Sequence, residues 1–117
     1  MRILLIDDDT NILSVLKVIL ESNGHIVDCA DSADDALDLV SEYDYDFVLV
    51  DFKMPTHDGA WFLRNAHLRR NTKALLMTAF LTPNVVNTMF MCGASGYIMK
   101  PLEQQEVLQH LAFHTGC

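Results

Sequence analysis

A run of four consecutive apolar residues, positions 47–50, lies between Asp46 and Asp51. A short apolar run that does not alternate with polar residues is typical of a β-strand buried on both faces of a sheet. Pro55 and a nearby Asp-Gly pair predict an ordered loop after it. Asp51 then lies at the carboxyl end of a core strand, where open parallel sheets bind their ligands. From this stretch alone, an aspartate that only ends a strand or caps a helix is an equally good interpretation.

Similar apolar runs recur along the chain, and each is followed by a segment whose apolar residues have helical spacing. The expected strands are residues 2–6, 25–29, 46–51, 73–78 and 96–99. The expected helices are residues 10–23, 32–40, 59–70, 82–92 and 103–114. Thr10 or Asn11 is the expected cap of the first helix, and Ser32 and Thr82 are the expected caps of the second and fourth.

Strands that alternate with helices pair in parallel through right-handed crossovers. The pattern therefore predicts an α/β fold, a doubly wound five-stranded parallel sheet of the flavodoxin-like (βα)5 type with helices on both faces. The strand order typical of that class is 2-1-3-4-5. Polar residues flank Ile26 and Val27 in the second strand, and this order places that weaker strand at an edge of the sheet.

Length, charge and cysteine content exclude several classes of protein. The 117 residues, half of them apolar, suffice for one domain, which we expect to span residues 1–117. A formal net charge of −8 argues against direct nucleic-acid binding. We do not expect the start of this sequence to be a signal peptide, because its apolar run is only residues 3–6 and three aspartates follow. No apolar run approaches the roughly 20 residues of a membrane span. Cys29, Cys92 and Cys117 lack C-x-x-C spacing and indicate reduced thiols in a cytoplasmic protein.

Polar side chains follow four of the expected strands. They are Asp7, Asp8, Asp51, Thr78 and Lys100. Because these four strands are neighbours in the expected order, we expect the side chains to converge. Adjacent carboxylates repel one another, and a hard divalent cation such as Mg²⁺ removes that repulsion. The lysine and threonine add donors for an anion, so the set predicts a site for a phosphoryl group.

The chain resembles the receiver domains of bacterial response regulators in two-component systems, which are CheY-like. The matching motifs are LLIDDD, VLVDFKMPTHDG, LLMTA and GYIMKPL, and they occur in order over essentially the whole chain. The resemblance implies that Asp51 accepts a phosphoryl group from a phosphohistidine of a sensor histidine kinase or phosphotransfer protein. Such a domain catalyses only its own phosphorylation and dephosphorylation. Either a stand-alone receiver or a piece of a longer regulator agrees with this sequence.

The resemblance also implies a ligand set for Mg²⁺ or Mn²⁺. Asp8 and Asp51 would bind the cation directly, and Asp7 would act largely through water. The backbone carbonyl of Lys53 would be a further protein ligand. Lys100 would pair with one oxygen of the phosphoryl group.

A conformational switch is the third implication of the resemblance. Thr78 would hydrogen-bond a phosphoryl oxygen, and Tyr97 would be the aromatic switch residue that turns inward. The surface of the fourth helix, fifth strand and fifth helix would then change for a partner or output domain. The Lys100-Pro101 peptide bond is expected to be cis.

Two other classes of protein use similar residues. A phosphohydrolase of the haloacid dehalogenase type also has an Asp-x-Asp motif, which Asp7 and Asp9 imitate, and a threonine after a later strand. That family needs paired carboxylates after its lysine, whereas only Glu103 and Glu106 follow Lys100 here. The other alternative is a receiver-like adaptor that works without phosphate. The complete set of acidic, lysine and threonine residues weighs against it.

Residues 79–99 contain no charged residue, although 21% of the protein is charged. An uncharged surface with methionine and phenylalanine has the composition of an interface core. We therefore expect the face of residues 82–99 to contact a dimer mate or an output partner. Within this segment, Cys92 and the methionines at positions 89, 91 and 99 are expected to pack rather than to bind metal. His57 is expected to be an exposed loop histidine, and the basic residues between positions 64 and 73 are expected at a helix C-terminus.

Overall fold

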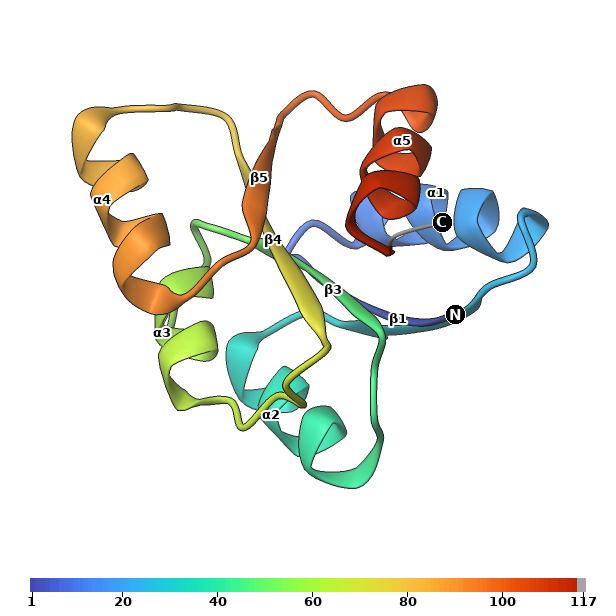
Figure 1. Cartoon of the computed structure of the whole chain (residues 1–117), viewed down its shortest axis with the longest axis horizontal. Helices are drawn as coiled ribbons and strands as arrows, with labels where there is room; N and C mark the ends of the chain where they lie inside the picture. Colours follow the sequence, from blue (N-terminus) through green and yellow to red (C-terminus); the bar gives the residue numbers. More distant parts are fainter. Residues whose placement is uncertain (116–117) are drawn as a thin grey trace.

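The computed structural model describes residues 1–115 of the chain. Five parallel strands form one sheet in the order β2-β1-β3-β4-β5, which confirms the predicted topology (Figure 1). The strands are β1 (Arg2–Ile6), β2 (Ile26–Ala30), β3 (Phe47–Asp51), β4 (Lys73–Thr78) and β5 (Gly96–Met99). The helices are α1 (Thr10–Ser22), α2 (Ala33–Glu42), α3 (Gly59–Asn65), α4 (Pro83–Cys92) and α5 (Gln104–Thr115).

The helices form a layer on each face of the sheet. Helices α1 and α5 cover one face, and α2, α3 and α4 cover the other (Figure 1). The side chains of each layer pack in a buried core of their own. Alternate residues of β1, β3 and β4 pack into opposite cores, because successive side chains of a strand point to opposite faces. Every residue of β3 is buried, which agrees with its unbroken apolar sequence, whereas Ile26 on the edge strand β2 is 62% exposed.

The ends of the helices follow their capping residues. Ser32 caps α2 by accepting a hydrogen bond from Asp35 N at 3.1 Å, and Thr82 caps α4. Gly93 ends α4 in the left-handed conformation with φ of 82°. The expected cap of α1 was wrong, because Asp9 rather than Thr10 or Asn11 accepts hydrogen bonds from the first turn.

Helix α3 is shorter than expected. It ends at Asn65, and Ala66 is already extended. Ala66 and Leu68 still pack against the core of α2, α3 and α4, so their apolar character did not require a helix. Arg69 is not at a helix C-terminus as expected. Its guanidinium lies 3.4 Å from both the carbonyl of Tyr45 and the Asp46 carboxylate, and this contact holds the segment after α3 to the segment before β3.

Two further expectations about single residues need correction. Met89 and Cys92 are buried as predicted, but Met91 and Met99 are 81% and 36% exposed and do not pack in the core. His57 is half-buried rather than exposed, because its ring stacks on Trp61.

Cys117 lies outside the described residues. Among residues 1–115, no helix is both long enough and apolar enough to span a membrane.

Candidate metal and anion site

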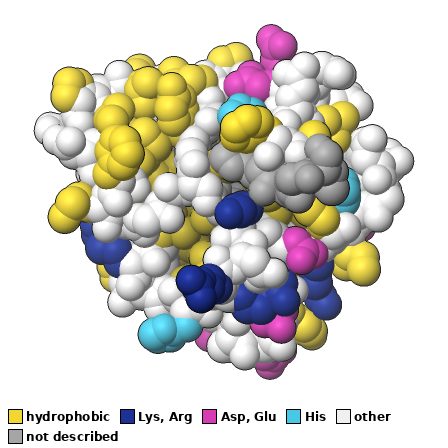
Figure 2. Space-filling model, in the orientation of Figure 1, with side chains coloured by type: hydrophobic (Ala, Val, Ile, Leu, Met, Phe, Trp, Pro, Cys, Tyr) yellow, Lys and Arg dark blue, Asp and Glu magenta, His cyan; other side chains and the backbone are white. Residues whose placement is uncertain are grey.

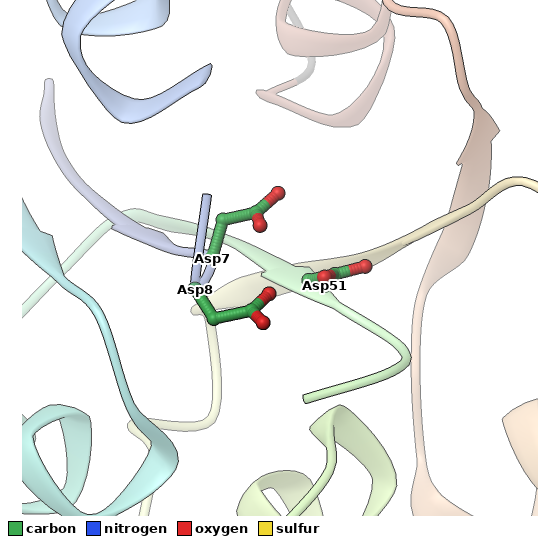
Figure 3. A group of neighbouring side chains, drawn as sticks. All are labelled: Asp7, Asp8 and Asp51. Atoms are coloured by element: carbon green, nitrogen blue, oxygen red, sulfur yellow. The ribbon is translucent and has the colours of Figure 1, made fainter. Parts of the chain in front are cut away.

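Three carboxylates converge at the carboxyl edge of the sheet. Asp7 and Asp8 follow β1, and Asp51 ends β3. One carboxylate oxygen of each residue lies within 4.8 Å of the others (Figure 3). Asp7 and Asp51 are 0% and 5% exposed, whereas Asp8 lies in solvent. The cluster is therefore enclosed by protein on one side and open to water on the other.

The local backbone explains why Asp7 and Asp51 are held in place. The Asp7 carboxylate accepts a hydrogen bond from Asp9 N at 2.9 Å, and Asp9 in turn caps α1. At the other strand, α3 begins so close to β3 that a Cβ on Gly59 would overlap the carbonyl oxygen of Asp51. Only glycine allows this approach, which ties the start of α3 to the end of β3.

Lys100 brings a positive charge to the same place from β5. Its ammonium nitrogen lies 2.9 Å from Asp7 Oδ2 and 3.2 Å from Asp51 Oδ1. The backbone N of Lys100 donates to the Thr78 carbonyl at 2.7 Å, which fixes the residue beside β4. The Lys100-Pro101 peptide bond is cis, as expected.

Burial and charge change the acidity of these groups. Burial, together with the neighbouring Asp7 carboxylate, raises the pKa of Asp51 to about 6, although Lys100 acts in the opposite direction. Burial would by itself lower the pKa of Lys100. The hydrogen bond to Asp7 and the charges of Asp51 and Asp7 outweigh burial, so the pKa of Lys100 lies above its ordinary value.

Thr78, at the end of β4, and Tyr97, on β5, are the two predicted switch residues. The Thr78 hydroxyl donates to the Phe80 carbonyl at 2.9 Å and accepts from Phe80 N at 3.2 Å, so it is engaged within its own loop. Thr78 nevertheless lines an open cavity of about 530 Å³ together with Asp51 and Lys100. Tyr97 lies on β5 with 39% of its surface exposed, facing outward rather than inward.

The donor set fits a hard divalent cation. Carboxylate oxygens are the ligands that Mg²⁺ prefers, and an exposed ligand such as Asp8 leaves room for the waters that Mg²⁺ retains. Within residues 1–115, no other group of three or more carboxylate, histidine or cysteine side chains gathers this closely. Lys53 lines the adjacent cavity from the loop after β3. A role for its carbonyl stays a prediction.

Two positioning roles were missed by the sequence analysis. The N-cap role of Asp9, whose backbone N also orients the Asp7 carboxylate, could have been predicted from the sequence. Aspartate is a preferred N-cap residue, and residues 7–9 are all aspartate. The role of Gly59 had only a weak signal. The Asp-Gly pair was interpreted as a turn, whereas the structure uses the missing side chain for close packing against Asp51.

Comparison with known proteins agrees with the fold. Residues 3–112 match the family model of the response regulator receiver domain. The chain is 33% identical over 117 residues to the sensory/regulatory protein RpfC of Xanthomonas campestris. The alignment covers 96% of this chain and 16% of that protein. It is 32% identical over 117 residues to the chemotaxis protein CheY of Treponema pallidum, and that alignment covers 95% of this chain and 80% of the relative.

A solved structure is similar over nearly the whole chain. The CheY-like response regulator receiver domain protein from Methanospirillum hungatei superposes with a TM-score of 0.90 at 34% identity, over 96% of this chain and 90% of that one. The chain belongs to the response regulator receiver domain family and is a CheY-like signalling domain of two-component systems. It spans 16% and 48% of the length of two curated relatives, RpfC and the cell cycle regulator CtrA.

The raised pKa of Asp51 predicts a pH-dependent effect of Asp51→Asn. Because the pKa of Asp51 is higher in the native protein than in the unfolded chain, protonation of Asp51 favours the folded state. This contribution to stability is complete below the ordinary pKa of aspartate and is lost as the pH rises through about 6. We expect Asp51→Asn to stabilise the metal-free protein by on the order of 1 to 3 kcal/mol near pH 7.5, and by much less near pH 5. Urea denaturation at both pH values measures this difference. An equal effect at the two pH values would contradict it.

Proposed function

We propose that this receiver is a phosphorylation-dependent switch in which Asp51 accepts a phosphoryl group from a phosphohistidine. The donor is a sensor histidine kinase or a phosphotransfer protein. The observation that carries the proposal is that a carboxylate cluster and the Lys100 ammonium meet around Asp51 at the rim of one open cavity. Receiver domains as a family interact with histidine kinases and output domains, and the donor proposed here belongs to that class.

Each residue has a defined part in the transfer. An oxygen of the Asp51 carboxylate attacks the phosphorus, the bond between phosphorus and the imidazole nitrogen breaks, and the neutral imidazole leaves after taking up a proton. Lys100 turns from the Asp51 carboxylate to an oxygen of the transferring group and stabilises its charge. The cation, Mg²⁺ or Mn²⁺, supplies further charge neutralisation when bound by Asp8, Asp51, the Lys53 carbonyl and, largely through water, Asp7.

The switch follows from the state of Thr78. Its hydroxyl exchanges the Phe80 carbonyl for an oxygen of the phosphoaspartate, which is a stronger acceptor because it is charged. The loop after β4 moves with Thr78, and Tyr97 turns inward from its exposed position on β5. This movement changes the surface of α4, β5 and α5. The present hydrogen bonds of Thr78 support this, because they are all within one short loop and break without disturbing the sheet.

Acetyl phosphate or beryllofluoride with Mg²⁺ tests the function directly. We expect a stable adduct on Asp51, detected by mass spectrometry of the intact protein or by ¹⁹F NMR. Asp8→Asn should prevent the adduct, because it removes a cation ligand, and should leave the fold intact because Asp8 is exposed. Turnover of phosphate esters would instead indicate a phosphohydrolase. A protein that forms no adduct and shows no turnover would be a phosphate-independent adaptor.

We also propose that the uncharged face of residues 82–99 is a contact surface. Phe90 and Met91 on α4 are each 81% exposed. Hydrophobic side chains gather over α4 at the upper left of the molecule (Figure 2). The rest of the chain carries a net charge of −8, so an approaching copy or acidic partner meets least repulsion here. A dimer mate or an output partner would cover this face, and inward rotation of Tyr97 would strengthen the contact.

Charge insertion tests this surface. Met91→Lys and Phe90→Lys should abolish self-association that beryllofluoride promotes in the wild type, because a buried lysine ammonium loses its hydration. Analytical ultracentrifugation measures the association. Val18→Lys is a matched control, since Val18 is 64% exposed on α1, on the other face of the sheet. If no variant self-associates and an output partner binds the lysine variants as well as the wild type, this face is not the interface.

We further propose that residues 1–117 act as a single receiver domain in the cytoplasm, without direct contact to nucleic acid or membrane. One sheet and its two cores draw on elements from Arg2 to Thr115, which supports a single domain. The net charge of −8 weighs against contact with phosphate backbones.

A further inference from the structure

The β3–α3 loop, residues 52–58, connects Asp51 to α3 and carries Lys53 of the proposed metal site. At its start, the Phe52 carbonyl accepts a hydrogen bond from the first residue of α3 at 3.0 Å. Its middle contains Thr56 in the left-handed region with φ of 70°. A β-branched residue rarely adopts this conformation, and it persists only where surrounding contacts hold it. A backbone hydrogen bond from His57 N to the Pro55 carbonyl, 2.8 Å long, closes the turn at Thr56, and side-chain contacts attach the loop to its surroundings.

The His57 side chain makes two of these contacts. Its imidazole lies flat on the indole of Trp61, with ring centroids 3.6 Å apart and an interplanar angle of 6°. Its Nδ1 lies 3.2 Å from Asp34 Oδ1 in the first turn of α2. The next residue, Asp58, caps α3 by accepting from Trp61 N at 2.8 Å. The loop is thus attached to α3 and also to α2, which lies beside α3 on the same face of the sheet (Figure 1).

The two contacts of His57 have different strengths. The Asp34 side chain is 62% exposed, so its ion pair with a protonated His57 is weak on its own. The stack on Trp61 is geometrically specific, because it requires a flat ring at position 57. The stack on Trp61 therefore positions the His57 ring, and the contact with Asp34 orients the Nδ1 edge of that ring toward α2.

We propose that His57 is a positioning residue for the metal site. By stacking on Trp61 and bonding to Asp34, it holds the β3–α3 loop in the conformation that presents the Lys53 carbonyl to the cation. This inference rests on the proposed Mg²⁺ site. It predicts that His57 sets the affinity for Mg²⁺ without contacting the ion, in the way that outer-shell partners orient metal ligands.

Calorimetric titration with MgCl₂ tests the inference. His57→Ala should weaken Mg²⁺ binding about tenfold, the lower end of what outer-shell partners of metal ligands contribute. His57→Phe keeps a flat ring on Trp61 and should recover part of that affinity. His67→Ala is the matched control, because His67 is an exposed histidine on the segment after α3, and it should bind as the wild type does.

Trp61 supplies a second readout, because it is the only tryptophan in the protein. Its fluorescence should rise in His57→Ala, which removes the stacked imidazole, and should not change in His67→Ala. An unchanged urea midpoint in His57→Ala would show that the loss of affinity is not a loss of fold. If His57→Ala binds Mg²⁺ as the wild type does while Asp8→Asn does not bind, the metal site stands and His57 has no positioning role. If the wild type binds no Mg²⁺, the metal site and this inference are both wrong.

Discussion

The ammonium of Lys100, placed between the carboxylates of Asp7 and Asp51, is the interaction on which the site depends. Two carboxylates that are 0% and 5% exposed repel each other strongly if both are ionised without a counter-charge. Lys100 lies 2.9 Å from one and 3.2 Å from the other. A buried charge cluster of this kind is weak evidence for stability. The importance of Lys100 is that its charge opposes the rise in the pKa of Asp51. Its ammonium also lies where it can bind an anion next to Asp51.

The parallel sheet is what makes this arrangement available. Lys100 and Asp7 are 93 residues apart in sequence, yet both follow strands whose carboxyl ends lie at one edge of the sheet. Between the strands that bear them lie β3, which supplies Asp51, and β4, which supplies Thr78. The four strand ends therefore bring three carboxylates, an ammonium group and a hydroxyl to one edge of the sheet. In the proposed switch, Thr78 would link phosphorylation of Asp51 to the exposed face of α4 and β5.

The sequence predicted the sheet, its strand order and the convergence of the acidic residues with Lys100, because hydrophobic periodicity and strand ends are local patterns. It did not predict where α3 ends, because Ala66 and Leu68 bury equally well in an extended segment. The sequence also did not predict the stack of His57 on Trp61, although the two aromatic residues are four positions apart near the start of α3. The residue before His57, Thr56, has a left-handed backbone conformation, which a β-branched threonine does not predict. The exposure of Tyr97 and the hydrogen bonds of Thr78 with Phe80 depend on the placement of individual side chains, which hydrophobic periodicity does not specify.

A double-mutant cycle between Lys100 and Asp51 tests the central claim most directly. Urea denaturation near pH 7.5 would compare Lys100→Met in the wild-type background and in the Asp51→Asn background. The account predicts that Lys100→Met destabilises the wild type by about 3 kcal/mol, because Asp7 and Asp51 are left unbalanced, and costs much less once Asp51 is neutral. Equal losses in the two backgrounds would show that Lys100 does not balance the charge of Asp51, and would contradict the account.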